Sequence, residues 1–295
     1  MNILVKKAAS IAAKISPETV TKVLFKHFLG YPLNMKHPRT LNEKMQYLKL
    51  RVYKGSRLVS DCVDKVKVRD YVASTVGEKY LTKLFGTWKN AKDIEYDKLP
   101  EEFVLKCNHG SGSNIICNNK ESLDRKQANE RLDSWLGMDF GSHRAELMYR
   151  DIDRKILCEE IINTVDGKPP KDYKFFCCYG KAKFLFVASD RYDNNTKFDY
   201  YDMDWNWIPV KNGHPNAGDV LEKPSNFDEM IAVAEKLSKP FPLVRVDLYN
   251  ENGKIIFGEL TFLHFAGLTP FVPKEYDLIF GDMADVDVTK CKGIE

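Results

Sequence analysis

The side chains best suited to chemistry are two carboxylates, Asp247 and Glu259, which flank the pair Asn252-Gly253. Asn-Gly between two runs of alternating apolar and polar residues predicts a β-hairpin. Side chains alternate between the faces of a strand. A three-residue loop, Asn252 to Lys254, therefore places Asp247 opposite Glu259, whereas an even loop would place them on opposite faces.

Two carboxylates that face each other across a pair of strands repel, and a cation between them removes that cost. Oxygen ligands of this kind suit Mg²⁺ shared with substrate phosphates. The same register places Arg245 opposite Thr261, and Phe257 on the face of Glu259. The alternative is a surface hairpin with scattered charges, which has no role in metal binding.

A second informative stretch, residues 103–117, combines a lysine with a loop of glycine and serine. An apolar strand carries Lys106 near its end, the loop Gly110-Ser111-Gly112-Ser113 follows, and a second strand comes next. Backbone N–H groups in such a loop can surround an anion, and glycine lets the backbone approach a phosphate closely. The loop lacks both the Gly-Lys-Ser/Thr end of a Walker A motif and the third glycine of a dinucleotide fingerprint. The alternative is an ordinary glycine turn.

Composition and charge favour one enzyme-sized unit with subdomains. The 295 residues are 43% hydrophobic and 12% aromatic, which is enough for a large core. The 45 basic and 42 acidic residues leave a net charge of +3, too balanced to predict binding to nucleic acid.

The cysteines and the start of the chain point to a cytosolic protein. The seven cysteines include no Cys-x-x-Cys pair, which argues against structural zinc and a disulfide framework and favours reduced thiols. No apolar run reaches the length of a membrane span. We expect residues 1–14 to form a helix packed on the body, with attachment to a membrane surface as the alternative.

The chain reads as a mixture of helices and strands. Residues 1–56 should be helical, with a capping box that begins at Thr40. Residues 60–72 should form a helix with Lys65 and Arg69 on one face. The further expected elements are a helix over 121–150, a strand over 156–162, a hairpin over 172–191, a strand pair over 202–209 and a helix over 227–237.

The order of these motifs resembles the ATP-grasp superfamily, and specifically its teichuronopeptide-biosynthesis (TupA-like) branch, found in bacterial cell-surface polysaccharide clusters. The likeness runs from Asp61 to Gly281. It rests on the following stretches: Asp64-Lys65 with Arg69 and Tyr71-Val72, Leu105 to Gly112, Glu159 to Ile162, Asp172, Arg245 with Asp247, and Gly258 to Phe262.

The resemblance implies an α+β fold in which two subdomains grip ATP between antiparallel sheets. A helical segment over 1–56 would precede an ATP-grasp domain over 57–281. Its lid would span about 100–158. Beyond this domain, the acidic stretch Asp282 to Asp287 predicts a loose tail over 282–295.

The resemblance also implies a role for each candidate residue, with ATP and Mg²⁺ as cofactors. The phosphate-binding candidates are Lys65, Lys106 and the closing loop Gly110, Ser111, Gly112 and Ser113. The adenine and ribose candidates are Glu159, Glu160, Ile161, Ile162 and Asp172. Arg245 would face the transferred phosphoryl group, with Lys174 and Arg191 as further contacts. The metal ligands would be Asp247, Glu259 and Thr261, the last standing where many members have Asn.

The implied reaction is the ATP-dependent joining of an amine or amino acid to the carboxylate of a uronic acid in a surface-polysaccharide precursor. An acyl phosphate would be the intermediate. The enzyme would work in the cytoplasm, free or at the inner face of the membrane and in contact with other assembly enzymes. The rivals are a sugar kinase on the same fold, an inactive nucleotide-binding adaptor, and a glycosyltransferase that uses Asp202-Met203-Asp204. His109, His264, Trp205 and Trp207 could contact substrate, although core packing is the simpler expectation for the tryptophans.

Overall fold

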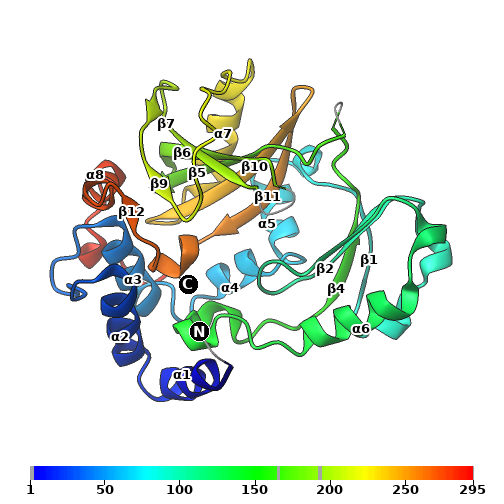
Figure 1. Ribbon diagram of the computed structural model, residues 1–295, viewed down its shortest axis with the longest axis horizontal. Coiled ribbons are helices and arrows are strands. Elements are labelled where there is room, and N and C mark those ends of the chain that lie inside the picture. The colour runs from blue at the N-terminus through cyan, green and yellow to red at the C-terminus, as the bar shows by residue number, and fades with distance from the viewer. Residues whose placement is uncertain (1–2, 165–166, 192–194, 295) are drawn as a thin grey trace.

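Two antiparallel sheets form the two lobes of the molecule (Figure 1). The computed structural model describes residues 3–164, 167–191 and 195–294. One sheet has four strands in the order β1-β4-β2-β3, and the other has six in the order β11-β10-β5-β6-β7-β8. Helices pack against both sheets, so the α+β class expected from the sequence is confirmed.

Three helices make up the helical segment predicted for residues 1–56. They are α1 (Ile3–Ile15), α2 (Pro17–Leu29) and α3 (Leu41–Arg51). The capping box is present, because the Thr40 hydroxyl accepts from Glu43 N and the Glu43 carboxylate accepts from Thr40 N. None of the helices in the described residues is long and apolar enough to cross a membrane.

The helix expected over residues 60–72 is broken at Asp64, which corrects the predicted placement of Lys65. Helix α4 (Arg57–Val63) ends there, and α5 (Val68–Thr75) starts four residues later. The Asp64 carboxylate accepts from Val66 N at 2.9 Å, a local bond that competes with helix formation. Lys65 therefore lies in a turn and does not share a helix face with Arg69.

The four-stranded sheet includes residues that precede the expected lid. Its strands are β1 (Leu84–Trp88), β2 (Phe103–Cys107), β3 (Asn114–Cys117) and β4 (Ile156–Glu159). Helix α6 (Arg125–Leu136) covers one face and buries Leu132 beneath it. The helix predicted over 121–150 is thus shorter, because Gly137 follows its end and Gly141 adopts a φ of +75° that a right-handed helix does not use.

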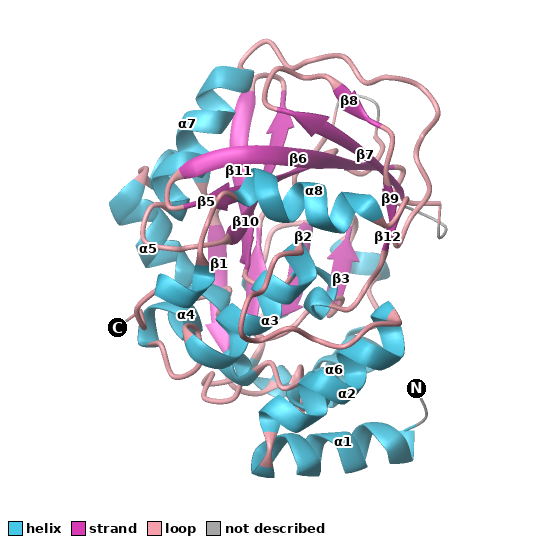
Figure 2. Cartoon of the chain, turned by 90° about the vertical axis from the view of Figure 1, so that its left-hand side faces the viewer, coloured by secondary structure: helices cyan, strands magenta, loops and turns pink. Residues whose placement is uncertain are grey.

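The six-stranded sheet carries helices on opposite faces. Its strands are β5 (Asp172–Cys178), β6 (Lys181–Ser189), β7 (Lys197–Asp202), β8 (Trp207–Ile208), β10 (Val244–Glu251) and β11 (Lys254–Thr261). Phe227 of α7 (Phe227–Ser238) stacks on Phe175, and Phe280 of α8 (Glu275–Ala284) stacks on Phe184. Figure 2 shows α8 crossing in front of the sheet. A small pair, β9 (Lys211–Asn212) and β12 (Phe271–Val272), lies beside α8.

The end of the chain packs on the body, contrary to the loose tail expected over 282–295. Helix α8 continues to Ala284, and Val286 and Val288 beyond it are 7% and 1% exposed. Both join the main hydrophobic core. Apolar burial holds this segment despite its acidic residues.

The hairpin of β10 and β11 has the predicted pairing of Asp247 with Glu259, but its turn differs from the predicted three-residue loop. Glu251 pairs with Lys254, so the turn has two residues, Asn252 and Gly253, both with positive φ. A β-bulge at Gly258 then shifts the register by one residue, and Asp247 faces Glu259. Phe257 pairs with Leu248 and therefore lies on the face opposite to Glu259. The prediction that Phe257 and Glu259 share a face is wrong.

We expect Gly258→Val to lower the free energy of unfolding by about 1–3 kcal/mol through overpacking. A Cβ at Gly258 would lie 3.1 Å from both the Asp247 carbonyl oxygen and the Tyr249 ring. Gly293→Val is the matched control, because nothing lies within 4 Å of its Cβ position. Denaturant unfolding measures both, and equal stability of the two variants would contradict the packing argument.

Candidate functional site

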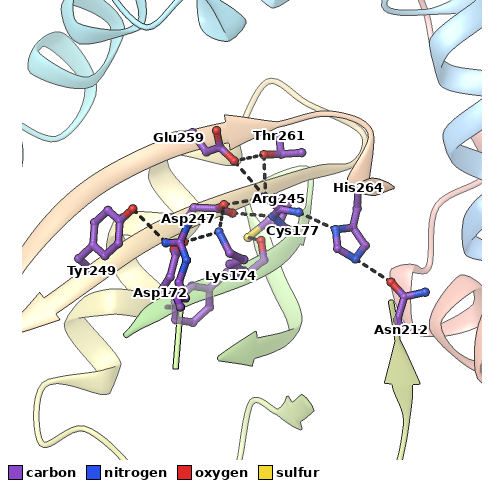
Figure 3. Close-up of polar contacts among 12 residues, drawn as sticks. Asp172, Lys174, Cys177, Asn212, Arg245, Asp247, Tyr249, Glu259, Thr261 and His264 are labelled. Carbon is purple, nitrogen blue, oxygen red and sulfur yellow. Dashed lines mark hydrogen bonds and ion pairs between the residues drawn. The ribbon is translucent and has the colours of Figure 1, made fainter. Parts of the chain in front are cut away.

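A buried ion-paired cluster occupies the face of β10 that carries Asp247 (Figure 3). Arg245 holds the Asp247 carboxylate with two parallel bonds, Nε to Oδ1 at 2.6 Å and Nη2 to Oδ2 at 2.7 Å. Lys174, directly opposite on β5, also donates to Oδ2. Asp247 is only 1% exposed, and this burial raises its pKa to about 6 despite the two cations.

Glu259 and Thr261 extend the cluster toward solvent. Arg245 Nη2 lies 3.2 Å from Glu259 Oε1 and 3.0 Å from Thr261 Oγ1, and the Thr261 hydroxyl donates to Glu259. Partial burial tends to raise the pKa of Glu259, but Lys174, Arg245 and Lys65 outweigh this effect and lower the pKa to about 2. Glu259 is therefore a carboxylate, and its side chain is 40% exposed. It offers an open position to a cation.

Asp172 forms the other end of the cluster. Its Oδ2 lies 2.5 Å from Lys174 Nζ and 2.8 Å from Arg191 Nη1. Its Oδ1 is buried and has no hydrogen-bond partner among the described residues. A buried oxygen left in this state is costly, so it suits a hydroxyl donor from a bound ligand. The structure thus joins Asp172, Lys174 and Arg191, which the sequence proposed separately.

A second cluster forms on the four-stranded sheet, where Lys106 of β2 forms an ion pair with Glu159 of the neighbouring strand β4. Glu159 also accepts from the Thr82 hydroxyl at 3.1 Å and lies 3.5 Å from Arg69. Burial opposes the ionisation of Glu159, but Lys106 and the other partners lower its pKa overall. Lys106 and Glu159 were expected to contact different parts of a ligand, and in this state they contact each other.

Lys65 connects the turn after α4 to the glycine and serine loop. Its ammonium donates to Gly110 O, and its N–H donates to Asn108 O at 3.0 Å. Gly110 and Gly112 have φ values of +79° and +80°, a backbone that only glycine adopts without strain. Ser111 and Gly112 are exposed, whereas Ser113 is buried.

Lys65 and Glu259 interact through their charges. Burial lowers the pKa of Lys65, and the charge of Glu259 opposes that shift. Lys65 in turn helps to lower the pKa of Glu259. Lys65 and Glu259 are therefore close enough for each charge to affect the pKa of the other.

Glu160 and Ile161 follow Glu159 in the chain but make none of the polar contacts of the two clusters. Strand β4 ends at Glu159, and the Glu160 carboxylate accepts from Lys83 N at 3.3 Å. Glu160 and Ile161 line a cavity of about 520 Å³ with Phe85 and Asn163, and neither Lys106 nor Asp247 borders it. The adenine-binding role of Glu160, Ile161 and Ile162 stays a prediction.

His264 contacts Arg245, and Asn212 contacts His264 in turn, whereas the sequence suggested only that His264 could contact substrate. His264 Nδ1 accepts from Arg245 Nη1 at 2.6 Å, and Nε2–H donates to Asn212 Oδ1 at 2.9 Å. Asn212 donates in turn to the carbonyls of Thr269 and Pro270. His264 is thus a neutral acceptor with both nitrogens occupied. A lone Asn in a two-residue strand offers no sequence pattern that would have revealed this role.

The Asp202-Met203-Asp204 motif serves a turn. Asp202 Oδ1 accepts from the backbone N–H groups of Asp204 and Asn206 at 3.0 and 2.8 Å. Trp205 stacks on Tyr201, with the ring centroids 4.5 Å apart, and donates its ring N–H to Leu221 O, as expected for core packing. Trp207 is 42% exposed.

Comparison with known proteins identifies a family whose model matches most of this chain. The family model described as TupA-like ATPgrasp matches residues 43–285. None of the curated proteins compared with the chain matches it significantly. Three similar solved structures are an L-amino acid ligase from Bacillus licheniformis, a D-alanine–D-alanine ligase from Bacillus anthracis complexed with ATP, and the ATP-grasp ligase PsnB complexed with a minimal precursor.

These structural likenesses concern the fold. The L-amino acid ligase is 13% identical, with a TM-score of 0.51 over 96% of this chain and 66% of its own. The D-alanine–D-alanine ligase is 16% identical (TM-score 0.46, 79% and 67% covered), and PsnB is 10% identical (TM-score 0.43, 78% and 62% covered). The chain thus spans about two thirds of the length of each.

We expect the neutral state of His264 to make the protein less stable in acid. Burial, and next Arg245, lower the pKa of His264 well below the usual value of about 6.5. Below pH 6.5 the unfolded chain binds the extra proton and the folded chain does not, so the free energy of unfolding falls as the pH drops. His264→Asn should remove up to about 1.4 kcal/mol of this decline per pH unit.

Denaturant unfolding at pH 7 and pH 5 measures this slope. His37→Asn, which alters an exposed histidine, is the control and should keep the wild-type slope. An unchanged slope in His264→Asn would show that His264 is not held neutral.

Proposed function

Because its residues 43–285 match the family model, the chain belongs to the TupA-like ATP-grasp family, and we propose that it is an ATP-dependent carboxylate–amine ligase. The observation that carries the proposal is the buried cluster of Arg245, Asp247 and Lys174 beside the open carboxylate of Glu259. Such a site neutralises and positions a phosphoryl group, and it needs no nucleophilic side chain.

ATP and Mg²⁺ are the cofactors of ATP-grasp ligases, in agreement with the sequence prediction. Glu259, Asp247 and Thr261 would hold the metal, since they supply the hard oxygen atoms that Mg²⁺ prefers. Glu259 is accessible, whereas Asp247 would have to exchange Arg245 or Lys174 for the metal. When bound, Mg²⁺ offsets negative charge on the phosphates.

The residues that contact ATP in this proposal come from both clusters. Lys65 and Lys106 bind phosphate oxygens, and the loop Gly110 to Ser113 closes over them. Asp172 uses Oδ1, which has no partner among the described residues, to accept from a ribose hydroxyl. Arg245 lies at the transferred phosphoryl group, with His264 as the neutral acceptor that fixes its Nη1.

The reaction proceeds in two steps. A carboxylate oxygen of the acceptor attacks the γ-phosphorus, the bond to the β–γ bridging oxygen breaks, and ADP leaves. The amine then attacks the acyl carbon of the acyl phosphate, inorganic phosphate leaves, and the amine loses a proton to solvent. Arg245, Lys65 and Lys106 stabilise the charge on the phosphoryl group during transfer.

For the substrate we propose a uronic acid of a bacterial surface-polysaccharide precursor, with an amino acid or another amine as the second substrate. The branch of the family to which the chain belongs supports this choice. The location that follows is the cytoplasm or the inner face of the membrane. A kinase that stops after phosphoryl transfer to a sugar remains the second candidate, because the same cluster serves both reactions. The turn formed by Asp202 disfavours the glycosyltransferase.

The first test is ADP release by the purified protein with Mg²⁺-ATP across a matrix of uronic acids and amines. We expect ADP release that requires both an acid and an amine, because the acyl phosphate needs the amine to complete turnover. Release with a neutral sugar alone would identify a kinase. Failure to bind ATP at all would contradict the proposal.

We expect Asp247→Asn and Glu259→Gln each to reduce ADP release by at least about 100-fold, since the metal that binds the phosphates would lose a charged ligand. Glu130→Gln, which changes an exposed carboxylate of α6 outside both clusters and outside the ATP-binding candidates, should retain near-normal release. Circular dichroism and thermal melting establish that the variants are folded. Near-normal turnover of either cluster variant in excess Mg²⁺ would refute the metal assignment.

We expect Lys106→Ala to weaken ATP binding by about 10–100-fold, the range for loss of one hydrogen bond to a charged group. Isothermal titration calorimetry measures the affinity. Lys120→Ala, which removes a lysine that donates to Leu99 O on the same lobe, is the matched control. Equal affinities of the two variants would exclude a phosphate contact for Lys106.

A further inference from the structure

Helices α1 and α2 form one end of the molecule, away from both sheets (Figures 1 and 2). Each helix attaches to the body by one face. Ala13 of α1 and a row of α2 side chains are buried in a small cluster with residues from elsewhere in the chain. The α2 members are Val20, Leu24, Phe25 and Leu29, and the others are Ala145, Ala266 and Leu268. The attachment expected for the start of the chain is therefore present, and it leaves the other face of each helix uncovered.

The uncovered faces carry large apolar side chains. Ile11 and Ile15 lie one turn apart on α1 and are 63% and 83% exposed. Val23 and Phe28 of α2 are 62% and 42% exposed. We call the exposed surface of the two helices, which carries these four residues, the apolar α1–α2 face. Exposed apolar groups that gather on one part of a protein mark a contact with another molecule or with a membrane.

Lysines are interspersed with the apolar α1–α2 face. The first 30 residues contain five lysines and one acidic residue, Glu18, and so carry a net charge of +4. The whole chain carries +3, so the other 265 residues together carry −1. The five lysines are all exposed: Lys6, Lys7, Lys14, Lys22 and Lys26. Positive charge is thus concentrated on the same two helices that expose the apolar residues.

We propose that the α1–α2 face binds the surface of an anionic lipid bilayer. Helices that lie in the membrane interface combine apolar side chains, which enter the acyl boundary, with lysines that meet anionic headgroups. The long lysine stems can extend along the helix while the ammonium groups remain in water. The proposal concerns attachment to the bilayer surface only and does not depend on the reaction assigned to the cluster at Arg245.

Co-sedimentation of the full chain with vesicles tests this proposal. We expect binding to vesicles of phosphatidylcholine mixed with phosphatidylglycerol and at least about tenfold weaker binding to phosphatidylcholine alone. Binding should weaken as the salt concentration rises from about 0.1 to about 0.5 M, because headgroup attraction is screened. Absence of binding to the anionic vesicles would overturn the proposal.

Paired variants locate the contact. Ile11→Glu combined with Ile15→Glu should reduce vesicle binding at least about tenfold, as should Lys7→Glu combined with Lys14→Glu. Val220→Glu is the matched control, since Val220 is 67% exposed and lies outside these helices. It should bind vesicles like the wild type.

ATP affinity and thermal melting show whether each variant keeps its fold, independently of any ligase assay. Wild-type binding by the Ile11 and Ile15 variant would overturn the proposal. So would a stable dimer in sedimentation velocity that these substitutions dissociate, because the face would then be covered by a second copy of the chain.

Discussion

The site depends on the bond between Arg245 and Asp247 inside the hairpin. A buried carboxylate is tolerated only when it is paired and hydrogen-bonded, and Asp247 uses both oxygens to accept from Arg245 and Lys174. These cations connect Asp247 to the other two carboxylates of the cluster, because Lys174 also pairs with Asp172 and Arg245 with Glu259. With Arg191 included, three acidic and three basic side chains balance, and the face is close to neutral without any ligand.

The bulge at Gly258 makes this arrangement possible. A two-residue turn alone would direct Asp247 and Glu259 to opposite faces of the hairpin. The extra residue restores the shared face, and only a residue without a side chain fits against the Asp247 carbonyl without displacing it. The local geometry of the backbone thus decides whether the two carboxylates meet.

The sequence predicted the elements with strong local patterns and missed those that depend on single side chains. Alternation and Asn252-Gly253 predicted the hairpin, and the motif order predicted the family, because both are repeated or spaced signals. The bulge and the break at Asp64 each depend on the local backbone around one residue, and the bond of His264 to Asn212 depends on a partner elsewhere in the fold. No repeated pattern or spacing along the chain reveals them. The predicted roles of Glu160 and Ile161 still rest on family resemblance alone.

All three lysines of the proposed ATP site already have acceptors within the protein. Lys65 donates to Gly110 O, Lys106 to Glu159, and Lys174 to Asp172 and Asp247. In the proposed reaction, ATP therefore exchanges these partners for phosphate oxygens and does not meet free cations. Such an exchange holds the lysines near their working positions before binding, which lowers the entropy lost on binding. When Lys106 turns to the ligand, it no longer balances the charge of the Glu159 carboxylate. The remaining partners of Glu159, Thr82 and Arg69, can then stabilise that charge.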